Sequence, residues 1–87
     1  MHPEQIRERL QEFKRLCRQA NVPVTAQRCA VLEAVLERDD HPTADQVSEV
    51  VSQRVPGISR TTIYRVLDML VDFGVIRRLH HAGTIAR

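Results

Sequence analysis

Three short breaks, each containing a proline, divide the sequence into four segments with helical periodicity. The breaks are NVPV at residues 21–24, DDHP at 39–42 and PG at 56–57. Proline lacks the backbone N–H that a helix interior needs, so each break ends the segment before it. Within the segments, apolar residues recur every three or four positions, as on the buried face of an amphipathic helix. The sequence therefore predicts helices at about residues 3–20, 26–38, 44–54 and 60–73.

Residues at the ends of these segments support the same division. Thr25 and Ser59 stand just before the second and fourth segments, where a hydroxyl can accept a hydrogen bond from a free backbone N–H. Thr43 and Gln46 form the T-x-x-Q pattern of a capping box at the start of the third segment. Gly74 follows the fourth segment, where a left-handed residue commonly ends a helix.

The segment after Gly74 has no helical period, and we predict that it forms a β-hairpin. The predicted wing covers about residues 75–87, with a turn signal at Ala82–Gly83. Its apolar and polar residues alternate irregularly, so the sequence does not assign the two faces of the hairpin. Compact helices followed by such a hairpin are typical of a winged helix-turn-helix. The expected fold is therefore mostly α-helical with a two-stranded wing. Helix 44–54 would be the supporting helix of the motif and helix 60–73 its candidate reading helix.

The length and composition are those of one small domain of 87 residues. No apolar run approaches the roughly 18 residues of a membrane span, and the first ten residues lack the core of a signal peptide. We therefore expect a cytoplasmic protein with no membrane partner. The net charge is +2, but residues 59–87 contain five Arg against two Asp, whereas residues 1–58 contain eight Lys or Arg against nine Asp or Glu. The basic end is expected to face a polyanion.

Neither catalysis nor a cysteine-based site is predicted. The chain has no G-x-S-x-G, Gly-rich phosphate loop or H-E-x-x-H motif, so we expect that it is not an enzyme. Cys17 and Cys29 lie twelve residues apart without the spacing of a zinc pair. We expect them to be small apolar residues in a reducing compartment.

The predicted helix at 60–73 carries an unusual set of side chains away from its apolar stripe. The polar set in and just before its first two turns is Ser59, Arg60, Thr61, Thr62, Tyr64 and Arg65. A reading helix contacts bases mainly with its N-terminal residues, whereas Asp68 and Asp72 fall in the second half and would repel DNA. Arg65 suits guanine or a phosphate, the Tyr64 ring suits a thymine methyl group, and the hydroxyls suit backbone oxygens. The alternative that periodicity leaves open is a winged helix that docks another protein.

Four motifs occur in order along the chain. They are T-x-Q-R at residues 25–28, H-x-T-A-x-x-V at 41–47, T-[VI]-Y-R-x-L at 62–67 and F-G-[LVI]-I at 73–76. Together they closely resemble the DNA-binding half of the ferric uptake regulator family, a group of iron-, zinc- and peroxide-responsive bacterial repressors. The resemblance covers about residues 21 to 79 and implies binding to double-stranded DNA.

The resemblance also implies roles for single residues. Tyr64 and Arg65 would contact DNA, and Thr62 would contact the backbone or cap the helix. Arg28 would lie near the phosphates or brace the helix pair. The family often has Lys or Arg where this chain has Pro23, so its minor-groove contact is not carried over.

In the wing, basic residues are expected to hold phosphate. Arg77 and Arg78 carry the charge, and partly protonated His80 and His81 add to it if the hairpin lies against the duplex. A solvated hairpin tip is the alternative for the two histidines.

A metal site and a dimer are further implications of the resemblance, and both depend on a C-terminal domain. In the family the histidine of H-x-T-A, here His41, joins ligands from the hinge and that domain. We expect no cofactor in these 87 residues alone, and zinc, iron(II) or manganese in a full-length parent. The parent is expected to be a homodimer on a palindromic operator, and this chain to be monomeric or weakly associating. We interpret it as the DNA-binding half, an expressed fragment rather than a naturally shortened protein.

Overall fold

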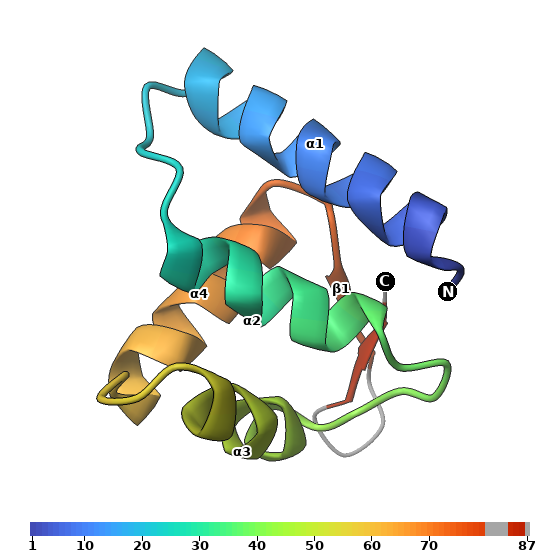
Figure 1. The fold of residues 1–87 in the computed structure, drawn as a ribbon, viewed down its shortest axis with the longest axis vertical. Coiled ribbons are helices and arrows are strands. Elements are labelled where there is room, and N and C mark those ends of the chain that lie inside the picture. The colour runs from blue at the N-terminus through green and yellow to red at the C-terminus, as the bar shows by residue number, and fades with distance from the viewer. Residues whose placement is uncertain (80–83, 87) are drawn as a thin grey trace.

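Four helices are followed by two short strands in the computed structural model, which describes residues 1–79 and 84–86. Figure 1 shows α1 lying across one side of a bundle formed by the other three helices. The elements are α1 (Pro3–Gln19), α2 (Ala26–Leu36), α3 (Ala44–Arg54), α4 (Arg60–Asp72), β1 (Arg77–Arg78) and β2 (Ile85–Ala86). All four helices begin at the predicted residue, and three of them end one or two residues before the predicted end.

The helix starts are set by side chains that the sequence placed there. The hydroxyls of Thr25 and Thr43 each accept a hydrogen bond from the backbone N–H three residues later, at 3.1 Å. Ser59 does the same for α4 at 3.0 Å. Gln46 completes the predicted capping box by accepting from the Thr43 N–H at 2.9 Å. Each contact satisfies a backbone group that the first helical turn leaves free.

The end of α4 follows the predicted glycine signal. Gly74 has a φ of 75°, in the left-handed region that favours glycine. Its N–H donates to the Val71 carbonyl at 2.9 Å, and the Val75 N–H donates to the Leu70 carbonyl at 3.1 Å. This pair of bonds is a Schellman motif, which turns the chain out of α4 toward the wing.

The core is built around α2, which packs against each of the other three helices. The sequence predicted one inner stripe on this helix, but it is buried on several sides, and the buried set is Val31, Leu32, Ala34, Val35 and Leu36. Phe13 of α1 is fully buried and its ring centroid lies 6.1 Å from that of Phe73, just after α4. Cys17 is buried and Cys29 half-buried, and both thiols are free.

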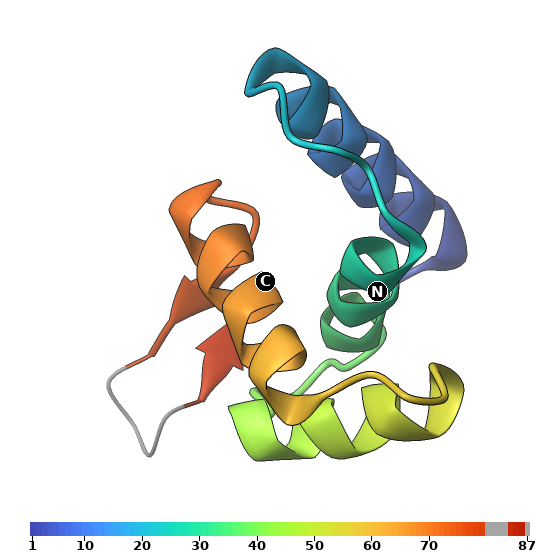
Figure 2. The ribbon, with the colours of Figure 1, turned by 90° about the vertical axis from the view of Figure 1, so that its left-hand side faces the viewer.

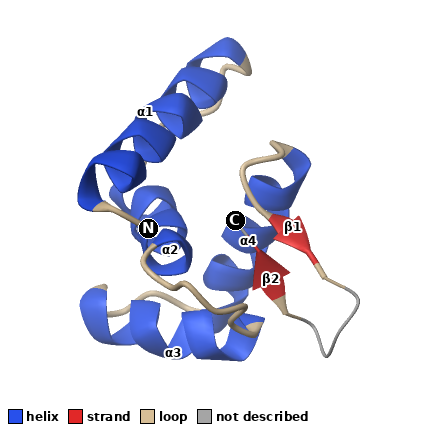
Figure 3. Cartoon of the chain, turned by 90° about the vertical axis from the view of Figure 1, so that its right-hand side faces the viewer, coloured by secondary structure: helices blue, strands red, loops and turns tan. Residues whose placement is uncertain are grey.

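The wing is a two-stranded antiparallel sheet fastened to the loop before α3. Arg77 pairs with Ala86 and Arg78 with Ile85. The Ile85 N–H donates to the Pro42 carbonyl at 2.9 Å, next to a bridge between Thr43 and Thr84. Burial differs between the two strands rather than between the two faces of the hairpin: Ile85 and Ala86 are both buried, whereas Arg77 and Arg78 are both exposed. Figure 3 shows the strands beside α4; His80, His81 and the predicted turn at Ala82–Gly83 lie outside the described residues.

Helix α4 is held at the centre of this arrangement. Figure 2 shows it with α2 on one side and the strands on the other. The connection from α3 includes Gly57 in the left-handed region, with a φ of 82°. The predicted order of supporting helix, reading helix and wing is therefore present. None of the helices in the described ranges is long and apolar enough to cross a membrane.

Candidate nucleic-acid interface

The first two turns of α4 present polar side chains on one side and core residues on the other. Ile63, Val66, Leu67 and Leu70 are buried and fix the rotation of the helix. Because of this rotation Arg60, Thr61 and Arg65 are exposed, together with the capping Ser59. Thr62 and Tyr64 are half-buried at the borders of the exposed face. The face predicted from the helical period is thus the face that the packing leaves open.

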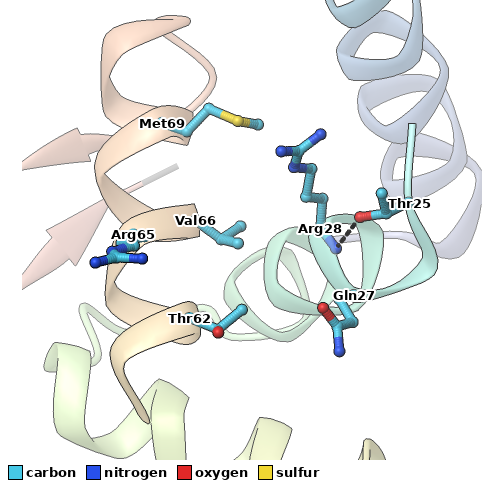
Figure 4. A pocket seen from close by; sticks show the side chains of 7 residues that line it. All are labelled: Thr25, Gln27, Arg28, Thr62, Arg65, Val66 and Met69. Atoms are coloured by element: carbon cyan, nitrogen blue, oxygen red, sulfur yellow. Dashed lines mark hydrogen bonds between the residues drawn. The ribbon is translucent and has the colours of Figure 1, made fainter. Parts of the chain in front are cut away.

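A cleft of about 260 Å³ separates this face from the start of α2. Figure 4 shows Arg28 extending from α2 into the space between the helices, with Val66 and Met69 facing it from α4. The residues that line the cleft are Thr25, Gln27, Arg28, Thr62, Arg65, Val66 and Met69. Two guanidinium groups and several hydrogen-bonding side chains from separate helices therefore border one opening, which makes it suitable for an anion such as a phosphate.

Arg28 is partly engaged within the protein. One terminal nitrogen of its guanidinium donates to the Pro23 carbonyl, just before α2. This contact ties Arg28 to the loop between α1 and α2. A guanidinium has five N–H donors, so the bond to Pro23 leaves others for the cleft.

Arg65 is exposed on α4, and its guanidinium has no hydrogen bond or ion pair with any described residue. Its charge is therefore available to a partner outside the chain. By contrast, Arg78 of β1 pairs with Asp68 of α4. The wing thus compensates one of the two acids expected to repel DNA. Arg77, its neighbour, is exposed beside the loop that precedes α3.

Tyr64 and Arg60 are joined to α3 by an acidic residue. The Tyr64 hydroxyl donates to Asp45 Oδ1, and Arg60 Nη2 donates to the same oxygen at 2.7 Å. Arg60 Nε also donates to the Tyr64 hydroxyl at 3.2 Å. The hydrogen bond from Tyr64, followed by the bond and charge of Arg60, holds the pKa of the Asp45 carboxyl below its usual value. In turn, Tyr64 and then Asp45 raise the pKa of Arg60.

Comparison with known proteins identifies the family. The model of the ferric uptake regulator family matches residues 19–87. The chain belongs to the ferric uptake regulator family. The peroxide-responsive repressor PerR of Staphylococcus aureus strain USA300 is 36% identical over 84 residues, which cover 97% of this chain and 57% of that protein. The chain thus spans little more than half the length of this curated relative.

Solved structures of regulators share the fold. A zinc uptake regulator complexed with zinc and DNA superposes with a TM-score of 0.83 at 26% identity, over 93% of this chain and 54% of that one. PerR of Streptococcus pyogenes gives a TM-score of 0.76 at 24% identity, over 88% and 54%. The predicted winged helix-turn-helix fold is confirmed. These relatives of the ferric uptake regulator family are transcriptional regulators, which agrees with the prediction that the chain is not an enzyme.

Two residues of this region were not predicted from the sequence. Gln27 lies in the T-x-Q-R motif and lines the cleft, whereas the motif predicted a role only for its neighbour Arg28. Asp45 directly follows H-x-T-A but was not singled out. An acid in the first turn of a helix is ordinarily explained by the helix dipole, and the sequence does not show that α4 lies within its reach.

The metal that the ferric uptake regulator family implies is not matched by a set of donors here. His41 is exposed in the loop between α2 and α3. The neighbouring acids already pair with positively charged groups of the protein: Asp39 accepts from the N-terminal amine at 2.7 Å, and both Asp40 oxygens accept from Arg38. Within residues 1–79 and 84–86, no three His, Cys, Asp or Glu side chains gather as a metal site would require. His41 and its surroundings therefore do not make a complete site.

Proposed function

We propose that this chain is a sequence-specific double-stranded DNA-binding domain, the reading head of a metal- or peroxide-responsive repressor that acts in the cytoplasm. The observation that carries the proposal is the opening between α2 and α4, which Arg28 and Arg65 both line beside the exposed start of the candidate reading helix. The regulator solved with DNA has the same fold, which supports a nucleic-acid partner.

In the proposed complex the first half of α4 enters the major groove. Arg65 binds guanine or a phosphate, because its guanidinium is exposed and uncommitted within the described chain. The Ser59 hydroxyl donates to Thr62 Oγ1 at 2.8 Å, so Thr62 keeps its own hydroxyl hydrogen for a backbone oxygen. Thr61 offers a second exposed hydroxyl. Arg77 holds phosphate from the wing.

The larger assembly is part of the proposal. Because the chain spans 57% of its PerR relative, we assign metal sensing and dimerisation to residues beyond these 87. Zinc, manganese or iron(II) would be bound in the parent with His41 as one ligand. Two heads of a homodimer would then read the two halves of a palindromic operator.

A selection experiment with a matched pair of variants tests the proposal. Duplexes selected by the wild-type chain from a randomised pool are compared with shuffled duplexes by fluorescence anisotropy. Arg65→Ala should weaken binding to the selected duplex by about 1–3 kcal/mol, because it removes a base or phosphate contact. Arg9→Ala is the control, since it removes the same charge from an exposed site on α1.

Salt dependence separates DNA reading from the alternative of protein docking. The affinity of a DNA reader should fall as salt rises, with a logarithmic slope of roughly −0.9 for each phosphate neutralised. Arg65→Ala should make this slope shallower if Arg65 binds phosphate. Failure to enrich any duplex, or equal losses for Arg65→Ala and Arg9→Ala, would contradict the proposal and favour docking to a protein.

A further inference from the structure

The cluster of Asp45, Arg60 and Tyr64 links the candidate reading helix to its supporting helix. Asp45 lies in the first turn of α3, and Arg60 and Tyr64 lie one turn apart on α4. A single carboxylate oxygen accepts from both side chains of α4, and these two also contact each other. The Arg60 guanidinium carbon lies 5.7 Å from the centroid of the Tyr64 ring. Three contacts therefore fix one phenol and one guanidinium.

This cluster contributes little to folding stability. The side chains of Asp45 and Arg60 are 70% and 64% exposed, so water and salt screen their attraction. Its main consequence is orientation. Holding the hydroxyl fixes the direction of the long axis of the Tyr64 side chain, and the Arg60 guanidinium that lies over the ring restricts its rotation about that axis.

The contacts also determine what each group offers to DNA. The Tyr64 hydroxyl donates its only hydrogen to Asp45 and accepts a hydrogen bond from Arg60. The ring is therefore the part of Tyr64 that is left for contact with bases. Arg60 carries a charge that Asp45 compensates, whereas the charge of Arg65 has no partner among the described residues. If Asp45 were absent, Arg60 would be free to bind any phosphate it reached, irrespective of sequence.

We propose that Asp45 is a positioning residue that sets sequence selectivity, by orienting the Tyr64 ring and by withholding Arg60 from the phosphate backbone. The inference rests on the proposed function, because it specifies how the same helix discriminates between duplexes. Asp45 itself does not contact DNA. It lowers affinity for unrelated sequences and raises the ratio between selected and shuffled duplexes.

The test measures that ratio for Asp45→Ala and a matched control. Asp45→Ala should bind the shuffled duplex more tightly, with a salt slope steeper by roughly 0.9 for one added phosphate contact. The selected-to-shuffled ratio should fall by about fivefold or more, as expected for one lost discriminating contact. Glu49→Ala is the control: it removes the same charge one turn later on α3, and Glu49 has no hydrogen bond or ion pair with a described residue. It should change both affinities equally and leave the ratio unchanged.

Tyr64→Phe isolates the orienting contact from the charge. It removes the hydrogen that Tyr64 donates to Asp45 without altering net charge. The ratio should fall while the salt slope stays that of the wild type. An unchanged ratio for Tyr64→Phe, or equal ratios for Asp45→Ala and Glu49→Ala, would overturn the inference.

A measurement without DNA distinguishes this inference from the proposed function. Tyr64 is the only tyrosine and the chain has no tryptophan, so ultraviolet tyrosine emission reports on this one side chain. Loss of the carboxylate acceptor in Asp45→Ala should change the emission, whereas Glu49→Ala should not. Unchanged emission in Asp45→Ala refutes the positioning role but leaves DNA binding intact. A wild-type chain that cannot distinguish selected from shuffled duplexes overturns both proposals.

Discussion

At the scale of single residues, Leu67 and Tyr64 show how one helical turn separates folding from the candidate interface. They are three positions apart on α4, yet Leu67 is 2% exposed in the core whereas Tyr64 is half-buried at its border. The hydroxyl of Tyr64 reaches Asp45 rather than an interior group. The helical period predicted this division, because buried positions must recur on one side of an amphipathic helix.

Substituting each residue with alanine should separate the two roles. Leu67→Ala should lower the free energy of unfolding by about 2–5 kcal/mol, because it leaves a cavity in the core. Tyr64→Ala should cost less stability than Leu67→Ala, since part of the ring already meets solvent. Relative to the stability that each variant loses, Tyr64→Ala should weaken binding to the selected duplex more than Leu67→Ala does. Urea denaturation followed by circular dichroism measures the first quantity, and anisotropy measures the second. A stability loss for Tyr64→Ala as large as that for Leu67→Ala would place its ring in the core.

At the scale of elements, the starts of the helices could be predicted because their signals are local. A capping hydroxyl and the N–H that it accepts from are three residues apart, so Thr25, Thr43 and Ser59 show their roles in the sequence itself. The break residues are equally local, since a proline alone prevents continuation of a helix. The sequence therefore placed every helix start correctly.

Contacts between elements could not be predicted in the same way. The sequence of α2 is apolar on most sides, with only Gln27, Arg28 and Glu33 polar among its eleven residues, which is typical of a buried helix. Which elements cover Val31 and Ala34 depends on neighbours distant in the chain. The burial of β2 could not be predicted, because its attachment through the bond from Ile85 to Pro42 spans more than forty residues. The outward direction of Tyr64 was predictable because it follows from the helical period alone. Its acceptor on α3 was not, because that contact depends on how two helices pack.

The cap of α4 provides a prediction for an element. Ser59→Ala should lower the free energy of unfolding by about 0.5–2 kcal/mol, because the Thr62 N–H loses its acceptor at the start of the helix. Ser59→Asp should keep that stability, since a carboxylate caps the helix and suits its positive end. The aspartate would nevertheless weaken DNA binding by repelling phosphate near the first turn. Denaturation and anisotropy on both variants test this; full DNA affinity in Ser59→Asp would place the start of α4 away from the duplex.

At the scale of the whole molecule, the size of the domain bears on how two copies would fit the proposed operator. Its dimensions are 32 × 27 × 23 Å. Half-sites one helical turn apart have centres separated by about 34–36 Å, so two domains fit side by side on one face of the duplex. A single head has one reading helix and lacks the gain in affinity that a second linked head provides.

Joining two copies should therefore restore tight binding only at the correct spacing. A Gly/Ser linker of about 40 residues has a mean span near 35 Å, which matches half-sites one turn apart. The linked pair should bind a palindrome of selected half-sites about 10²–10⁴ times more tightly than the single chain does. Moving the half-sites apart by about half a turn places them on opposite faces of the duplex and should remove most of this gain, and a duplex with one half-site is the control. An equal gain at every spacing would mean that the linked heads add charge without reading position, because non-specific attraction to phosphate has no register along the duplex.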